Sequence, residues 1–136
     1  MRYYWLSFLS GCAWAAIALL LSFGAFGWLI VGGIIAAPFI GLFIGFLYRP
    51  AYRLPKVAQF FAALLTLYVA AALFGLAIGT FDALWRNIPN RTGTIEVILQ
   101  AMLAALWGVT FTGYVLLLWP LAFLNHRWLG KAYRAA

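Results

Sequence analysis

Apolar residues dominate this chain in long runs, and polar residues gather in short segments between them. From Tyr3 to Leu47 there is no charged side chain at all. One helix of that length would measure roughly 67 Å, about twice the ~30 Å hydrocarbon core of a bilayer. The run must therefore turn back once, and Gly24 and Gly27 favour the turn because glycine tolerates its dihedral angles. This pattern predicts helices at 4–23 and 27–47.

Two further apolar runs follow the polar segment 48–56. The first begins after Pro55, a residue that suits the first turn of a helix because it has no N–H to leave unpaired. The second begins after Thr94, a good N-cap, with Glu96 in the first turn where the helix dipole favours negative charge. We expect helices at 57–80 and 95–124. A helix over 95–124 would measure roughly 45 Å, so it should tilt, protrude or bend near Pro120.

Composition identifies the environment of these helices. Of the 136 residues 68% are hydrophobic and 8% are charged, whereas about a quarter of the residues in soluble domains are charged. The sequence predicts an all-α integral membrane protein, a single domain over 1–136 with four transmembrane helices in an antiparallel bundle and a short basic tail at 125–136. Cys12 is the sole cysteine, which excludes an intrachain disulfide.

The charged residues predict the orientation. All but two of the nine Lys and Arg side chains fall on the side of both termini and the 48–56 segment, whereas Arg86 and Arg91 lie on the other side with Asp82 and Glu96. Under the positive-inside rule both termini face the cytoplasm, and we expect the bacterial inner membrane. We expect these cytoplasmic cations to contact anionic lipid, not nucleic acid: Arg49, Arg53, Lys56, Arg127, Lys131 and Arg134.

Small residues recur four apart on every predicted span, as close helix packing in a bilayer requires. The stripes are Ser7, Gly11 and Ala15; Gly33, Ala37, Gly41 and Gly45; Ala71, Gly75 and Gly79; and Ala104, Gly108 and Thr112. They are interpreted either as contacts inside one bundle or, for the long stripe on the second span, as a contact with another subunit, foreign or a second copy.

Catalytic and metal-binding residues are missing from the predicted spans, whose interiors contain no Asp, Glu, Lys, Arg or His. Asp82 and Glu96 belong to one side and His126 to the other, so no acid–base pair or metal-ligand set can converge. We therefore predict no enzymatic activity. His126 is interpreted as an interfacial residue of the basic tail, with a pigment or haem ligand as the alternative. The segment 81–96 is interpreted as a small ion-pair network.

Three aromatic side chains with polar atoms fall near the middles of spans: Trp14, Tyr68 and Trp107. Each must hydrogen-bond where water is scarce, to Thr66, to Thr110 or to a carbonyl. The alternative is that they line a space for a quinone, a carotenoid, a chlorophyll-type pigment or a lipid, with Gln100 as a polar contact.

These observations leave three functional hypotheses. The leading one is a non-enzymatic subunit that packs against a larger energy-transducing or transport complex and fills lipid or cofactor space. The second is a homo-oligomeric channel or carrier, with a polar lining of Thr66, Thr80, Gln100, Thr110 and Thr112. The third is a bundle that binds a quinone, a pigment or a lipid.

Overall fold

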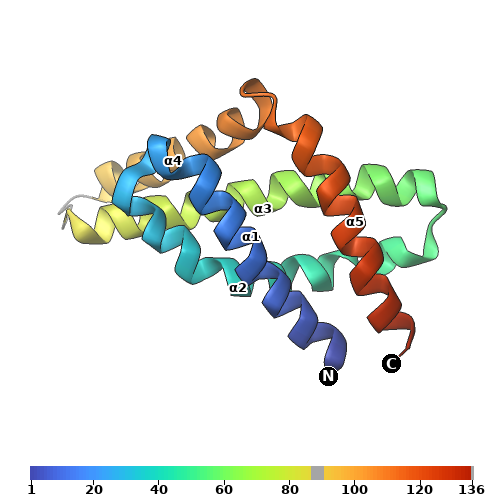
Figure 1. Ribbon diagram of the computed structural model, residues 1–136. Helices are drawn as coiled ribbons and strands as arrows, with labels where there is room; N and C mark the ends of the chain where they lie inside the picture. The colour runs from blue at the N-terminus through green and yellow to red at the C-terminus, as the bar shows by residue number, and fades with distance from the viewer. Residues whose placement is uncertain (87–90, 136) are drawn as a thin grey trace.

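The computed structural model describes residues 1–86 and 91–135, and these residues form helices with no strand among them (Figure 1). The elements are α1 (Arg2–Phe26), the 3-10 turn η1 (Gly27–Leu29), α2 (Ile30–Tyr48), the 3-10 turn η2 (Arg49–Arg53), α3 (Lys56–Trp85), α4 (Arg91–Phe111) and α5 (Tyr114–Arg134). Four stretches are long and apolar enough to cross a membrane: Arg2–Ser22, Gly24–Arg53, Lys56–Trp85 and Gly93–Phe111.

The turn predicted in the first long apolar run is confirmed at Gly27. This glycine has φ +57°, a left-handed conformation that side chains with a Cβ rarely adopt, and it opens η1. Gly24, the other predicted turn residue, lies inside α1, which therefore continues to Phe26. α3 likewise runs past the predicted end at residue 80 to Trp85.

The prediction of one helix over 95–124 is wrong. The chain forms two helices there, and the break falls at Gly113 with φ +76°, not near Pro120, which lies inside α5. α4 also begins at Arg91, upstream of the predicted cap Thr94. Glycine is the residue that can take this left-handed conformation without strain, so Gly113 can reverse the helix direction where a proline would only kink it.

The predicted tail at 125–136 is not a tail either. Residues up to Arg134 continue α5, and His126, Leu129 and Gly130 are buried in it; Ala136 lies outside the described residues. Leu118, Ala122, His126 and Leu129 follow one helical face, and this face packs against the other helices. Packing of that face explains why the helix continues past the apolar run.

The helices do not close into the expected four-helix antiparallel bundle. α3 lies between α2 and α4, and α1 packs on α2, so α1 to α4 form a row; α1 and α4 make no extended contact in the described chain (Figure 1). α5 crosses this row and contacts α3, α1 and α4.

Both termini meet the η2 turn at one end of the molecule. The Tyr3 ring lies 6.1 Å from that of Tyr52 and 5.2 Å from that of Tyr133, edge to face in both cases. The Tyr3 hydroxyl donates to the Gly45 carbonyl at 2.6 Å, and Arg49 donates to the Tyr4 hydroxyl at 2.5 Å. We call this the tyrosine end; it joins the three segments that carry most of the basic residues.

Candidate functional site

The small residues of α1 and α2 form the contact between the two helices. A Cβ placed on Gly41 would lie 2.6 Å from the Gly11 Cα and 2.6 Å from the Ser7 carbonyl oxygen, far inside van der Waals contact. The two backbones therefore touch at Gly11 and Gly41, and Ala37 is buried beside them. Gly41 and Gly45 of the long stripe on α2 face α1 along this crossing, as the interpretation as contacts inside one bundle expects. The contact of this stripe with another subunit stays a prediction.

The small residues on α3 pack against α4 in the same way. A Cβ on Gly75 would lie 2.7 Å from the Met102 Cα, and one on Gly79 would lie 2.6 Å from the Ile98 Cα. On the α2 side, Gly33 lies against the ring of Phe74. These glycines hold α2 and α4 close to α3.

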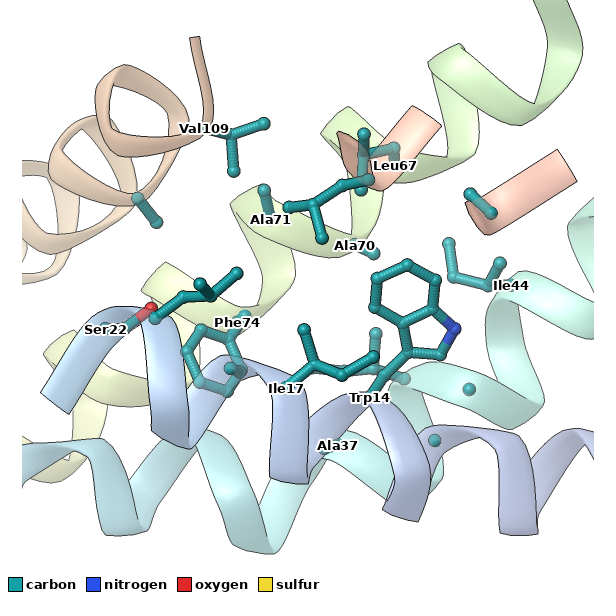
Figure 2. A pocket seen from close by; sticks show the side chains of 18 of the residues that line it. Trp14, Ile17, Ser22, Ala37, Ile44, Leu67, Ala70, Ala71, Phe74 and Val109 are labelled. Carbon is teal, nitrogen blue, oxygen red and sulfur yellow. The ribbon is translucent and has the colours of Figure 1, made fainter. Parts of the chain in front are cut away.

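The small residues near the end of α4 have no such partner. Around Gly108 a Cβ would meet nothing within 4 Å, and Ala104, Gly108 and Thr112 all border a partly open cavity of about 230 Å³. The cavity lies among all five helices, and its walls are mostly apolar. Figure 2 shows Trp14 and Ile17 of α1 facing Ala70, Ala71 and Phe74 of α3 across it, with Val109 of α4 on the far side.

Polar side chains gather where α5 borders this cavity. His126 is 3% exposed, and its ring lies flat on that of Tyr48, with the two centroids 3.6 Å apart. Its Nε2 atom lies 3.0 Å from the Thr66 Oγ1. One residue earlier, Asn125 accepts a hydrogen bond from the Ser10 hydroxyl through Oδ1 at 3.0 Å. Four of these residues line the cavity, namely Ser10, Thr66, Asn125 and His126; we call them the polar end.

The imidazole of His126 is uncharged at neutral pH. Burial lowers its pKa from 6.5 to about 4, because desolvation penalises the cation. His126 belongs to α5, outside the four candidate spans. Its Nδ1 atom is buried and has no hydrogen-bond partner within the described residues. An orphaned ring nitrogen beside a cavity is unusual, since nearly all buried polar atoms are paired.

The structure changes the interpretation of His126 but leaves its predicted ligand role untested. It is a core residue and not an interfacial one, because α5 continues through it and inserts it between α2 and α3. The signal that could have revealed this was its spacing of four and eight residues from Ala122 and Leu118. Ser10 and Tyr48 were missed because their partners, Asn125 and His126, were assigned to a tail, and Asn125 was missed as part of that tail.

Of the four predicted apolar-ligand contacts, Trp14, Tyr68, Trp107 and Gln100, the structure places Trp14 alone at the cavity. Tyr68 pairs with the Thr110 hydroxyl at 3.1 Å, as one interpretation expected. Trp107 is 60% exposed and stacks on Phe111 at 4.5 Å. Gln100 donates to Glu96 on the outer face of α4 at 3.1 Å. These three side chains therefore do not converge with Trp14.

Most hydroxyl groups proposed to line a channel are satisfied by their own helix. Thr80 donates to the Leu76 carbonyl at 2.8 Å and Thr110 to the Leu106 carbonyl at 2.9 Å; Thr112 bonds the Gly108 carbonyl. Thr66 alone belongs to the polar end. These bonds leave no continuous polar stripe from these residues.

At the end opposite the tyrosine end, Asp82 forms an ion pair with Arg86. Their side chains make two hydrogen bonds, of 2.7 and 2.8 Å, at the C-terminal end of α3. Glu96 pairs with Gln100, and the side chain of Arg91 and residues 87–90 lie outside the described part of the chain. Among the side chains that the structure describes, Asp82–Arg86 is the ion pair seen in this segment.

The cations predicted to contact lipid lie mostly on the surface: Arg53, Lys56, Arg127, Lys131 and Arg134 are exposed, and Arg49 is half-buried among aromatic rings. Within residues 1–86 and 91–135, no three His, Cys, Asp or Glu side chains are grouped to hold a metal ion.

Comparison of the chain with family models, curated proteins and solved structures gives no match.

Proposed function

We propose that this chain is an integral membrane protein that binds an elongated apolar molecule among its five helices. The observation that carries the proposal is the cavity, whose apolar walls come from every helix and which ends at a cluster of polar side chains. Such a combination of apolar walls and a few convergent polar groups is typical of small-molecule sites. The protein would hold its ligand without chemical conversion.

The size and opening of the cavity constrain the ligand. Its volume of about 230 Å³ lies below the ~300 to 1,000 Å³ typical of pockets for drug-sized molecules. A single ring or part of a narrow chain fits this volume better than a chlorophyll-type macrocycle. Because the cavity is partly open, the rest of a long chain can continue into the surrounding bilayer. A quinone, a carotenoid end group or a lipid has this shape.

Orientation forms part of the proposal. The tyrosine end carries both termini and the η2 turn, and with them the basic segments that the positive-inside rule assigns to the cytoplasm. We place this end at the cytoplasmic face of a bacterial inner membrane, where its cations would contact anionic lipid. The polar end of the cavity then lies closer to the cytoplasmic face than the walls formed by Ile17 and Phe74.

Filling the cavity from α4 tests the binding function. A Gly108→Phe substitution introduces a ring where a Cβ meets nothing within 4 Å and where the cavity is bordered by α4. Gly24→Phe is the matched control, because Gly24 also has open space around it but does not line the cavity.

The measurement is mass spectrometry of molecules extracted from protein purified in lipid nanodiscs. We expect an apolar molecule enriched over bulk lipid in the wild type and in Gly24→Phe, and lost in Gly108→Phe. Equal lipid content in all three, with no enriched molecule, would contradict the proposal.

A subunit of a larger membrane complex is the second candidate, favoured by the exposure of α4. Only 6% of the most apolar 18-residue stretch of this helix is buried within the chain, compared with 22% to 28% for the other candidate spans. Its outward residues Leu99, Leu103, Trp107 and Phe111 are all large. Native mass analysis of the same preparation distinguishes the two: the 15.1 kDa chain with a small molecule supports binding, and a larger assembly supports a subunit role. The homo-oligomeric channel stays a prediction.

A further inference from the structure

A second pocket lies at the tyrosine end and opens to the surface. It is lined by Met1, Tyr3, Tyr4, Arg49 and Tyr133. These residues come from the beginning of the chain, from the η2 turn and from the end of α5. None of the five borders the apolar cavity, so this pocket is a separate place on the molecule.

Aromatic rings hold Arg49 in this pocket. The carbon of its guanidinium group lies 5.6 Å from the centroid of the Tyr4 ring and 5.4 Å from that of Tyr133. Contacts of this kind between a cation and an aromatic ring are attractive. Arg53 belongs to the same η2 turn but is exposed and does not line the pocket. An arginine that is already held in place loses less side-chain entropy when it binds an anion.

The polar groups of the pocket include two with hydrogens to donate. Arg49 donates to the Tyr4 hydroxyl at 2.5 Å, and a guanidinium group can only donate, so the Tyr4 oxygen is the acceptor. The proton of the Tyr4 hydroxyl has no acceptor among residues 1–86 and 91–135. The Tyr3 hydroxyl, by contrast, already donates to the Gly45 carbonyl. Arg49 and Tyr4 therefore offer adjacent N–H and O–H donors.

No acidic side chain neutralises Arg49. The chain has two, Asp82 and Glu96, and both lie at the opposite end of the molecule. Asp82 forms an ion pair with Arg86, and Glu96 accepts a hydrogen bond from Gln100. A guanidinium group that is partly withdrawn from water is stabilised by an anion that accepts its N–H groups. The side chains of this protein supply no such anion, so it must come from outside the chain.

We propose that this pocket binds the phosphate group of an anionic lipid headgroup, with Arg49 as the cation and Tyr4 as a second donor. A phosphodiester has one negative charge and oxygens that accept from both groups. The tyrosine end carries the basic segments and aromatic rings that mark the headgroup level of a membrane. The inference rests on the proposed membrane placement and not on the proposed apolar ligand of the cavity.

The test measures which lipids stay bound to the full chain. Protein is purified in nanodiscs that contain equal amounts of phosphatidylglycerol and phosphatidylcholine, and retained lipids are counted by native mass spectrometry. We expect the wild type to retain phosphatidylglycerol with a preference of about tenfold, the size of one charge-assisted hydrogen-bond pair.

Two substitutions in the η2 turn form a matched pair, because each removes one positive charge. In Arg49→Gln we expect the preference to fall to about twofold, the attraction that the other cations still provide. In Arg53→Gln it should stay at about tenfold, since Arg53 lies outside the pocket. An equal fall in both variants would overturn the site, because charge number alone would then decide binding.

Tyr4→Phe keeps the ring and removes the hydroxyl. Tyr4 is 38% exposed, so this variant keeps the fold even if Arg49→Gln loosens the tyrosine end. We expect a preference of about threefold, and an unchanged tenfold preference would remove Tyr4 from the site. Thermal unfolding in phosphatidylcholine alone checks that each variant is folded.

Two further outcomes identify the source of the phosphate and separate this inference from the function on which it rests. Millimolar inorganic phosphate should leave phosphatidylglycerol bound, and its displacement to the Arg49→Gln level would overturn a lipid as the occupant. A chain that does not enter nanodiscs would overturn the membrane placement and this site with it. Absence of an apolar molecule from the cavity leaves the lipid preference unchanged, because the two sites share no residue.

Discussion

The crossing of α1 with α2 and the inner face of α4 carry the same sequence pattern and produce opposite structures. Both have small residues four apart: Gly41 and Gly45 on α2, Ala104 and Gly108 on α4. At the crossing, a Cβ on Gly41 would overlap the backbone of Gly11. On α4, a Cβ on Gly108 would meet no atom within 4 Å.

The difference lies in what faces each stripe. Gly41 faces Gly11 on α1, a helix that ends only a short turn before α2 begins, so two small surfaces meet and the backbones touch. α1 would close the bundle beside α4, but the two helices make no extended contact in the described chain. After α4 the chain turns at Gly113, and α5 crosses the other helices toward the tyrosine end. A small residue allows close approach, and without a partner the same residue leaves a cavity.

The largest effect is expected from breaking the close contact. Gly41→Leu would place a branched side chain into the backbone of α1, and we expect a loss of more than about 3 kcal/mol in the free energy of unfolding, since backbone cannot move aside. Thermal unfolding in detergent measures it, with Gly24→Leu as the unhindered control. A Gly41→Leu variant that keeps its stability but changes its oligomeric state would instead show that this stripe faces another subunit.

A smaller effect on stability is expected from the titration of His126, which borders the cavity. Its pKa is about 4 in the folded protein and 6.5 when unfolded, so the unfolded state binds the proton more readily between these values. Stability from this group is present above pH 6.5 and is lost as the pH falls toward 4. Between pH 7 and 5 the loss should be about 2 kcal/mol, at ~1.4 kcal/mol per pH unit.

His126→Gln isolates this contribution, because the substitution removes the imidazole and leaves every other side chain in place. We expect the wild type to lose more stability than His126→Gln over that interval in parallel thermal unfolding series. Parallel curves for the two proteins would show that the imidazole is not desolvated.

The smallest effects on stability are expected from substitutions at Gly108, near the end of α4, and at Gly113, which follows it. Gly113→Ala should cost about 1 kcal/mol, because alanine is strained at φ +76° although no atom lies within 4 Å of its Cβ. Gly108→Ala should raise stability by about 0.5 kcal/mol, because alanine favours the helix and the space is open. Chemical denaturation resolves both, with Gly113→Asn as a control that tolerates the left-handed conformation. A stabilising Gly113→Ala would place the break elsewhere.

Much of the fold could be predicted because it depends on local physics. The turn at Gly27 follows from the length of an apolar run that no bilayer could accommodate as one helix, and the start of α3 after Pro55 follows from proline chemistry. The break at Gly113 was missed because the bend in this apolar run was predicted near Pro120. The extension of α5 was missed because a basic segment was interpreted as a solvated tail.

The candidate site was the least predictable part. Trp14 was identified for its mid-span position, but Asn125, Ser10 and Tyr48 were not, and His126 was placed at the surface. Their proximity depends on the angle at which α5 crosses the row, which no spacing along the chain encodes.

The sequence alone determined that the chain is helical, where its apolar segments lie, and that its basic residues gather at the connections and ends, because hydropathy and glycine or proline chemistry act over a few residues. Only the tertiary structure decided which small residues touch and which border a cavity, and that an uncharged imidazole meets Thr66 across sixty residues of chain. Such contacts depend on helix crossing angles, and the left-handed Gly113 directly precedes α5, the helix that carries His126.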